Sequence, residues 1–387
     1  MIDGHFLPSR SDLAGAFGDL GTFAPLTIGM ISACHLDPTN VMIVFGLSYF
    51  VSALVYRMPM PVQPMKAIAA LAIAEGATVA TIAGSSLTIG ILMLIFVLTG
   101  SLGWFAKTTP RAVVRGIQLG LAFTLIVTAI GFMQKSGAVN ILGVNVSYLA
   151  VAAICFVIVL VLSNNRKIPS LLVVVPIGLG LATIGTPFLK LVPLQPSLPT
   201  LSSSLTYGGI ITGLVTLTIP QIPLTIGNSV IATESLSRLL CPGKRTVTVK
   251  RLGLTLGVMN VFSSAVGGVP MCHGAGGLAA HYRFGARTSK ATIIMGIILV
   301  SFGLLYGKTL TTILGQFPLP ILGVILLFGA LQLALTIRDV TGREEIFIVI
   351  LVSVLCAFIP YGFVIGWPTG ILLTRVLNRK GRVSMSS

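Results

Sequence analysis

The sequence predicts an all-α polytopic membrane protein whose 14 transmembrane segments form a 7+7 inverted repeat, with two segments broken into half-helices. Composition, apolar runs and repeated motifs lead to this prediction. Of the 387 residues, 55% are hydrophobic and only 9% are charged, and the mean hydropathy is +1.00. A soluble domain carries about 25% charged residues. Apolar runs of about 18 residues recur from end to end, which leaves no stretch for a soluble catalytic domain.

Apolar runs between polar, proline or glycine breaks give seven expected spans in each half. In the first repeat, residues 1–200, they lie near 12–34, 39–56, 64–80, 87–106, 112–131, 146–163 and 168–188. In the second repeat, residues 201–387, they lie near 208–236, 251–266, 270–282, 291–306, 318–336, 346–359 and 361–375.

The distribution of positive charge along the chain indicates orientation in a membrane rather than binding to a nucleic acid. Net charge is +16, from 25 Lys and Arg against nine Asp and Glu. If the N-terminus is cytoplasmic, only Lys135, Lys190 and Lys308 fall on the outer side, and Lys66 stays within the bilayer. Such a bias predicts both termini in the cytoplasm. We expect the protein in the plasma membrane of the cell. The lipid bilayer is therefore the expected partner, and no nucleic acid is expected.

Two motifs recur in the same order in both halves. The segment FAPLTIGM at 23–30 matches QIPLTIGN at 221–228, and VQPMKAIAALA at 62–72 matches GVPMCHGAGGLAA at 268–280. Because seven is odd, the second repeat must start on the opposite side of the membrane. Inverted repeats are typical of secondary transporters, whose binding site lies near the midplane.

The third and tenth spans are short and are interrupted by the matched Pro-Met motifs. The preceding segments, 59–63 and 265–269, are poor helix formers, whereas proline suits a first helical turn. We expect half-helices that begin at Pro64 and Pro270, with free amides facing one cavity and forming an anion site. Prolines that merely kink packed helices are the alternative. The amides in question are those around Met65, Lys66, Ala67, Met271, Cys272 and His273.

Polar residues in these apolar spans complete the expected anion site. A lone Lys66 in the bilayer costs about 3 kcal/mol or more, so it requires an acidic partner or a bound anion. Asp19 is the expected partner, either as a neutralising charge or in coupling and gating. Ordinary interhelical hydrogen bonding is the alternative for the polar residues of the eighth span. The expected substrate-binding residues are Thr22, Gln63, Met65, Lys66, Gln221, Thr225, Asn228, Met271, Cys272, His273 and Gly274.

Further acids and one Cys-His pair suggest additional chemistry. Glu75 and Glu234, like Asp19, could carry a coupling proton, although Glu234 lies one turn from Arg238 and could simply pair with it. Cys272 and His273 raise an intramembrane enzyme as an alternative of a different class. No second His or Cys group stands at ligand spacing, so we expect no metal, no cofactor and no catalysis.

The motifs also resemble a known family. GDLGTFAPL at 18–26, PVQPMKAIAA at 61–70, PQIPLTIGNSVIAT at 220–233 and PMCHGAGGLAAHYRFGART at 270–288 resemble the MOT1-type molybdate transporters, which are related to the sulfate permeases. The resemblance implies import of molybdate, a tetrahedral divalent oxyanion. A transporter for sulfate or another oxyanion is the alternative within that class.

The resemblance further implies a uracil-permease-like fold. In that fold a core domain, here 12–106 plus 208–306, moves against a gate domain, here 112–188 plus 318–375. It also implies alternating access and a homodimer joined through the gate domains.

Overall fold

A computed structural model describes residues 9–135, 137–141, 144–162, 171–183, 195–201, 205–242 and 246–384. Seven helices in these ranges are long and apolar enough to cross a membrane. The prediction of a helical membrane protein is thereby confirmed, whereas the count of 14 segments stays a prediction. Lys190, expected on the outer side, lies outside the described residues, as do the basic residues Arg166, Lys167, Lys244 and Arg245 on the expected cytoplasmic side.

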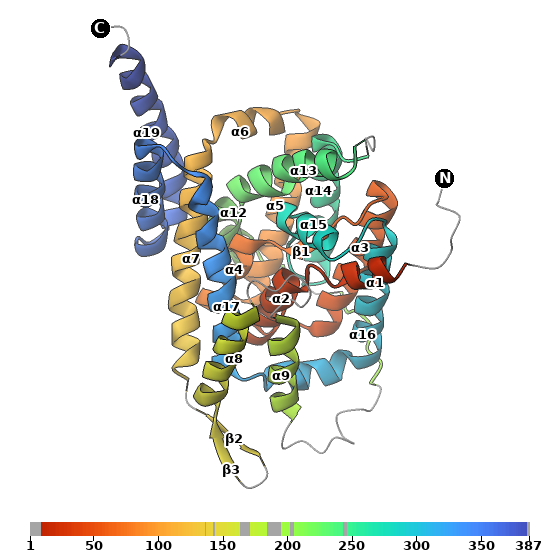
Figure 1. The fold of residues 1–387 in the computed structure, drawn as a ribbon. Helices are drawn as coiled ribbons and strands as arrows, with labels where there is room; N and C mark the ends of the chain where they lie inside the picture. Colours follow the sequence, from red (N-terminus) through yellow and green to blue (C-terminus); the bar gives the residue numbers. More distant parts are fainter. Residues whose placement is uncertain are drawn as a thin grey trace.

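The elements follow one another in a similar order in the two halves (Figure 1). The first half contains α1 (Arg10–Ala16), α2 (Leu20–Cys34), α3 (Pro38–Tyr56), β1 (Gln63–Pro64), α4 (Lys66–Glu75), α5 (Val79–Leu98), α6 (Leu102–Thr108), α7 (Arg111–Met133), β2 (Ala138–Ile141), β3 (Val144–Ser147), α8 (Tyr148–Leu162) and α9 (Leu171–Thr183). The second half contains α11 (Tyr207–Thr212), η1 (Gly213–Thr218), α12 (Ile219–Leu224), η2 (Thr225–Ala232), α13 (Thr233–Leu240), α14 (Val249–Ala265), β4 (Met271–Cys272), α15 (Ala275–Arg283), α16 (Lys290–Gly315), α17 (Leu319–Ala334), η3 (Leu335–Asp339), α18 (Arg343–Phe358) and α19 (Gly362–Ser384).

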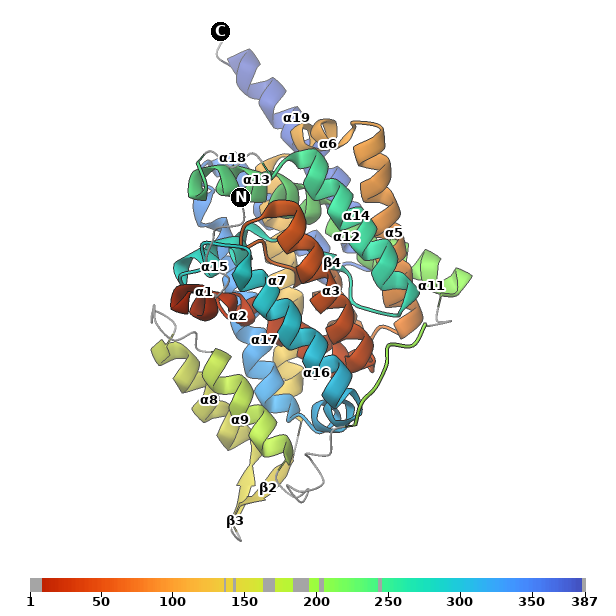
Figure 2. The same ribbon diagram turned by 90° about the vertical axis from the view of Figure 1, so that its right-hand side faces the viewer.

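Helices from the two halves pack against each other in a reciprocal way. The helix before β1, α3, packs on α16, and the helix before β4, α14, packs on α5, as Figure 2 shows. Close approach depends on small residues, because a Cβ on Gly46 would lie 2.8 Å from the Gly296 carbonyl oxygen. Helix α7 packs on α17 and α18 and forms the other side of the molecule. In each half, the helix before the short strand packs on a helix of the other half, as expected for two structurally related halves.

The two matched Pro-Met motifs meet at the centre of the fold. Strands β1 and β4 pair antiparallel, with Gln63 opposite Cys272 and Pro64 opposite Met271. The short helices α4 and α15 then begin at Lys66 and Ala275, not at the prolines as we expected. Extended backbone explains the difference, because Pro64 belongs to β1 and the Pro270 carbonyl, just before β4, accepts from the Met65 amide at 2.9 Å.

Other boundaries differ from the expected spans for local reasons. The first span is divided into α1 and α2, which leaves Asp19 at the N-terminus of α2. The fourth span begins earlier, at Val79, because the Thr78 hydroxyl accepts from the Thr81 amide and caps the helix. The hairpin of β2 and β3 was not predicted from the sequence.

The eighth span forms one helix from Tyr207 to Leu240 with two widened, π-type regions, η1 and η2. They flank α12, which contains Pro220 and Pro223. Proline lacks the N–H that the regular helical ladder needs, and π-type turns are frequent at functional sites. The irregular part of this helix therefore packs against the short helices α4 and α15.

Candidate functional site

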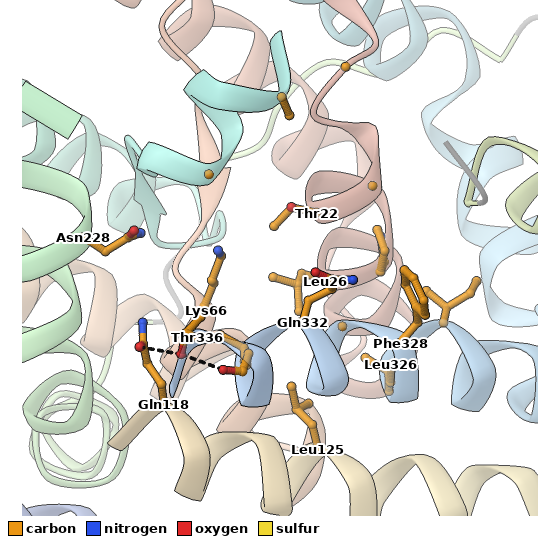
Figure 3. Close-up of a pocket in the computed structure, with 18 of the residues that line it drawn as sticks. Thr22, Leu26, Lys66, Gln118, Leu125, Asn228, Leu326, Phe328, Gln332 and Thr336 are labelled. Atoms are coloured by element: carbon orange, nitrogen blue, oxygen red, sulfur yellow. Dashed lines mark hydrogen bonds between the residues drawn. The ribbon is translucent and has the colours of Figure 1, made fainter. Parts of the chain in front are cut away.

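A cavity of about 450 Å³ lies between the two sides of the molecule (Figure 3). Helices α2, α4 and α15 and the η2 region contribute one wall, and α7, α17 and η3 contribute the opposite wall. Within the described chain, three cations and no Asp or Glu line this cavity, so its charge suits an anion. The charged and amide or hydroxyl residues of the wall are Thr22, Lys66, Arg115, Gln118, Asn228, Arg283, Gln332 and Thr336.

Lys66 is the cation at the centre of the first wall. It is the first residue of α4 and is half-buried. Its ammonium lies near the first turn of α15, because a Cβ built on Gly276 would be 3.9 Å from Nζ. Among the residues that the structure describes, no acid forms an ion pair with Lys66. The ammonium is therefore available to the cavity, beside Thr22 and Asn228.

A side chain from the second half holds the start of α4. Gln221 Oε1 accepts from the amides of Ala67 at 2.8 Å and Ile68 at 3.4 Å, and its Nε2 donates to the Thr225 hydroxyl at 3.0 Å. The Ala67 amide is thus not free, contrary to our expectation. A buried helix start needs acceptors for its first amides, and Gln221 supplies one. Gln221 and Thr225 are buried behind the cavity wall.

Asn260 of α14 holds the backbone that follows the second break. Its Oδ1 accepts from the Met271 amide at 2.7 Å, and its Nδ2 donates to the Met271 carbonyl at 2.8 Å and the Leu256 carbonyl at 2.7 Å. The Met271 amide, which we also expected to be free, is therefore occupied. A buried amide without such a partner would carry a desolvation cost.

The Cys-His pair of the second motif is structural. His273 is buried, and its Nδ1 donates to the Pro61 carbonyl at 2.8 Å. In the neutral ring, Nε2 then accepts from the Thr255 hydroxyl at 3.0 Å. The thiol of Cys272 points to the Pro64 carbonyl instead. The two side chains therefore do not form a nucleophile and base, and the described residues contain no His, Cys, Asp and Glu group able to hold a metal.

Asp19 is buried beside the breaks but does not pair with Lys66. Its Oδ1 accepts from Gln63 Nε2 at 2.6 Å, whereas Oδ2 has no hydrogen-bond partner among the described residues. A Cβ on Gly277 would lie 2.7 Å from that Oδ2. The direct Asp19–Lys66 ion pair that we expected is not formed, because Gln63, aligned by β1, binds the carboxylate; the two opposite charges still attract each other, and the role of Asp19 as a neutralising charge stays a prediction. Met65 and Gly274 are the backbone caps before α4 and α15.

The other two acids lie away from the cavity. Glu75 is the last residue of α4, which Gly76 ends in a left-handed conformation, and its side chain is exposed. Its role as a proton carrier stays a prediction. Glu234 pairs with Arg238 at 2.9 Å, which is the plain ion pair that its spacing allowed.

The second wall was missed from the sequence. Arg115 and Thr336 each lie within hydrogen-bond distance of Gln118, and Arg115 and Arg111 both pair with Asp339. A glutamine within the apolar run 112–131 was a signal for such a role. Figure 3 shows Gln118 extending toward the side where Lys66 and Asn228 lie.

Comparisons with known proteins agree in sequence and in fold. A family model described as "Molybdate transporter of MFS superfamily" matches residues 11–125 and 213–333. "Molybdate transporter 2" of Arabidopsis thaliana is 33% identical over 414 residues, covering 96% of this chain and 88% of that protein. "Molybdate transporter 1" of the same plant is 31% identical, covering 99% and 91%.

Solved structures of similar fold are more distant in sequence. The transmembrane domain of the cyanobacterial bicarbonate transporter BicA has a TM-score of 0.67 at 16% identity, covering 94% of this chain and 98% of that one. Murine Slc26a9, an anion transporter in the inward-facing state, has a TM-score of 0.73 at 13% identity, covering 98% and 69%. The family match spans more than half of the sequence and the plant relatives align over nearly all of it, so the chain belongs to the molybdate transporters of the MFS superfamily and is a membrane transporter rather than an enzyme.

Proposed function

We propose that this transporter imports molybdate by secondary active transport, with alternating access of one central site. The observation that carries the proposal is Lys66, a cation without an ionic partner among the described residues, at a cavity whose wall contains three cations and no carboxylate. A divalent oxyanion supplies the charge that such a cavity lacks. The names of the plant relatives support molybdate as that anion.

The anion would lie between Lys66 and the first turn of α15. Amides at a helix start have no acceptor within the helix, and the helix dipole favours a negative charge there. In α15 the Leu278 amide is the one that donates to the Gly274 carbonyl, so the amides of Ala275, Gly276 and Gly277 precede the helical ladder. We infer that α4 and α15 are the two half-helices of the inverted repeats, with Thr22 and Asn228 adding hydrogen bonds to the anion.

The remaining expected site residues have a supporting role in this proposal. Gln221 and Thr225 fix the start of α4, and Gln63 binds Asp19. Met65, Met271, Cys272, His273 and Gly274 form the paired backbone or its anchors. They shape the site without touching the anion.

We place the transport motion at the cavity. Thr22, Lys66 and Asn228 belong to the core domain, 12–106 plus 208–306, and Gln118 and Thr336 belong to the gate domain, 112–188 plus 318–375. Arg115 and Arg283, at cavity positions, fall on the expected cytoplasmic ends of their spans. On that basis we propose an inward-facing state with cytoplasmic termini. A plasma-membrane location and a homodimer joined by the gate domains are further proposals, the latter resting on the family resemblance alone.

Protons are the proposed coupling ion, and Asp19 is the proposed carrier. It is the acid that is buried beside the site, whereas Glu75 is exposed and Glu234 is paired. Protonation would remove a buried charge that has one unpartnered oxygen. Uptake should therefore rise when the outer side is more acidic than the inside.

The test is uptake of labelled molybdate by purified protein in liposomes, with and without an imposed pH gradient. Tungstate, sulfate and uracil serve as competitors at equal concentration. We expect strong competition by tungstate, weaker competition by sulfate and none by uracil. Sulfate uptake as fast as molybdate uptake would favour the sulfate transporter. Uptake of neither anion above that of empty liposomes would reject the proposed function, and uptake insensitive to the gradient would reject proton coupling.

A further inference from the structure

Gln118 of α7 is a buried polar side chain on the gate-domain wall, only 5% exposed. Its Oε1 accepts from Arg115 Nη1 at 2.8 Å. The Thr336 hydroxyl, which also contacts the Leu333 carbonyl, lies 2.9 Å from the same oxygen. The carbonyl end of this amide is therefore fully engaged with neighbouring side chains.

Those contacts determine which way the amide faces. A guanidinium only donates hydrogen bonds, so the atom that it contacts must be the oxygen of Gln118. The opposite end, Nε2, then carries two N–H groups. Within the described part of the chain, Nε2 has no hydrogen-bond partner, and Gln118 lines the cavity. Figure 3 shows the nitrogen end pointing, in that view, toward the side where Lys66 and Asn228 lie.

The support behind Gln118 is itself anchored. Arg115 Nε donates to Asp339 Oδ1 at 3.0 Å, its second terminal nitrogen pairs with Oδ2, and Arg111 pairs with Asp339 as well. Because Asp339 holds the guanidinium from behind, Arg115 presents Nη1 to Gln118 in a fixed direction. A donor held in place before binding loses little freedom when it engages a ligand.

We propose that Gln118 is the gate-domain ligand of the transported oxyanion, donating from the wall opposite Lys66. The inference rests on the proposed function and adds a contact from the second domain. An oxyanion offers acceptors only, which matches a side chain whose available atoms are both donors. Arg115 and Asp339 are positioning residues in this arrangement. Contact with both domains lets one bound anion hold the core and gate domains together.

The sharp test is Gln118→Glu, measured by molybdate titration of the purified protein. Glutamate has the same shape and keeps one oxygen for Arg115 and Thr336, but it replaces both donors by an anionic oxygen. We expect affinity to fall by about 100-fold, and by about 10-fold in Gln118→Leu, which removes the donors without adding charge. The matched control is Gln332→Glu, which adds the same charge to an exposed residue of the same cavity and should change affinity less than about threefold.

The outcomes separate this inference from the proposed function. Absence of molybdate binding by the unaltered protein would reject the proposed function itself. Normal binding that Lys66→Ala abolishes and both Gln118 variants retain would overturn the role of Gln118 alone. Equal weakening by Gln118→Glu and Gln332→Glu would also overturn it, since cavity charge would then be the cause. Melting temperatures without anion, expected to be unchanged in Gln118→Glu, confirm that the variants are folded.

Discussion

The two broken regions are alike in backbone and different in chemistry. Each passes from a long helix through an extended Pro-Met segment, joins the same two-stranded pair and continues into a short helix. The first break supplies a charge, Lys66, at the start of α4. The second supplies space, because Gly274, Gly276 and Gly277 leave only the methyl group of Ala275 at the start of α15. The two halves therefore contribute different features: the first a positive charge, the second open space.

The two breaks are also held differently. Gln221, which holds the first break, comes from the other half of the chain, whereas Asn260, which holds the second, comes from the helix just before it. Contact across halves at the first break joins α4 to the π-widened helix that also carries Asn228. The side chain that holds the first break therefore comes from the opposite half, whereas the one that holds the second comes from the same half.

The largest effect should follow from removing the charge of the first break. Lys66→Ala deletes the ammonium that faces the cavity, and a charge-assisted hydrogen bond contributes about 1.5–3 kcal/mol, so molybdate affinity should fall by about 100-fold. Titration of the purified protein measures the loss. Lys308→Ala, which removes an exposed lysine remote from the cavity lining, is the control and should bind normally. Normal affinity in both variants would remove Lys66 from the site.

Removing the side-chain amides of Gln221 and Asn260 should have similar effects on stability and different effects on molybdate binding. Gln221→Ala leaves the Ala67 amide buried without an acceptor, and Asn260→Ala does the same to Met271, so each should destabilise the fold by about 1–3 kcal/mol. Only Gln221→Ala should also weaken molybdate binding, by about 10-fold, because it releases the helix start that carries Lys66. Thermal unfolding and titration of both variants test this difference. An equal loss of affinity in the two would contradict the division between the breaks.

Composition and apolar runs were sufficient to predict the helical membrane class. The repeated Pro-Met motifs also lie where the backbone is extended, at β1 and β4, whereas the broken half-helices remain a proposal. Proline and glycine at Pro64 and Gly274 indicate non-helical backbone by their own chemistry. The starting residues of α4 and α15 were not predictable in this way, because strand pairing between β1 and β4 decides where the helices begin. That pairing joins segments about 200 residues apart, which local patterns do not report.

The site shows the same limit. Lys66, Thr22 and Asn228 stood out as polar residues in apolar spans, and all three line the cavity. The partners of Asp19 and Gln221 depend on tertiary packing and could not be read from spacing. Gln118 is a polar signal in the run 112–131, but the sequence alone does not separate a site residue from ordinary hydrogen bonding between helices. Its relevance follows from Arg115 and Thr336, which only the fold brings beside it.

Adding a methyl group at Gly276 should test whether the anion occupies the space beside the start of α15. In Gly276→Ala the new carbon would approach only Lys66 Nζ, at 3.9 Å, so the fold should tolerate it. Molybdate affinity should fall by about 10-fold, because the methyl group fills space beside the ammonium. Gly21→Ala adds the same group to the same cavity where no atom lies within 4 Å, and it should bind normally. Titration of the pair decides whether the first turn of α15 contacts the anion.

The smallest effects belong to the far ends of the two short helices, where Glu75 ends α4 and Arg283 ends α15, both exposed. A helix C-terminus favours cations and disfavours anions by about 0.3–1 kcal/mol. Glu75→Gln should therefore stabilise the protein by that amount and leave uptake and its pH dependence unchanged.

Arg283→Gln should destabilise the protein to the same extent. It should also weaken molybdate binding by about twofold to threefold, since Arg283 lines the cavity whereas Glu75 does not. Thermal unfolding gives the opposite signs directly, and titration at low and high salt gives the charge effect. A loss of gradient-driven uptake in Glu75→Gln would instead place the coupling proton on α4, at the end of the very helix that Lys66 begins.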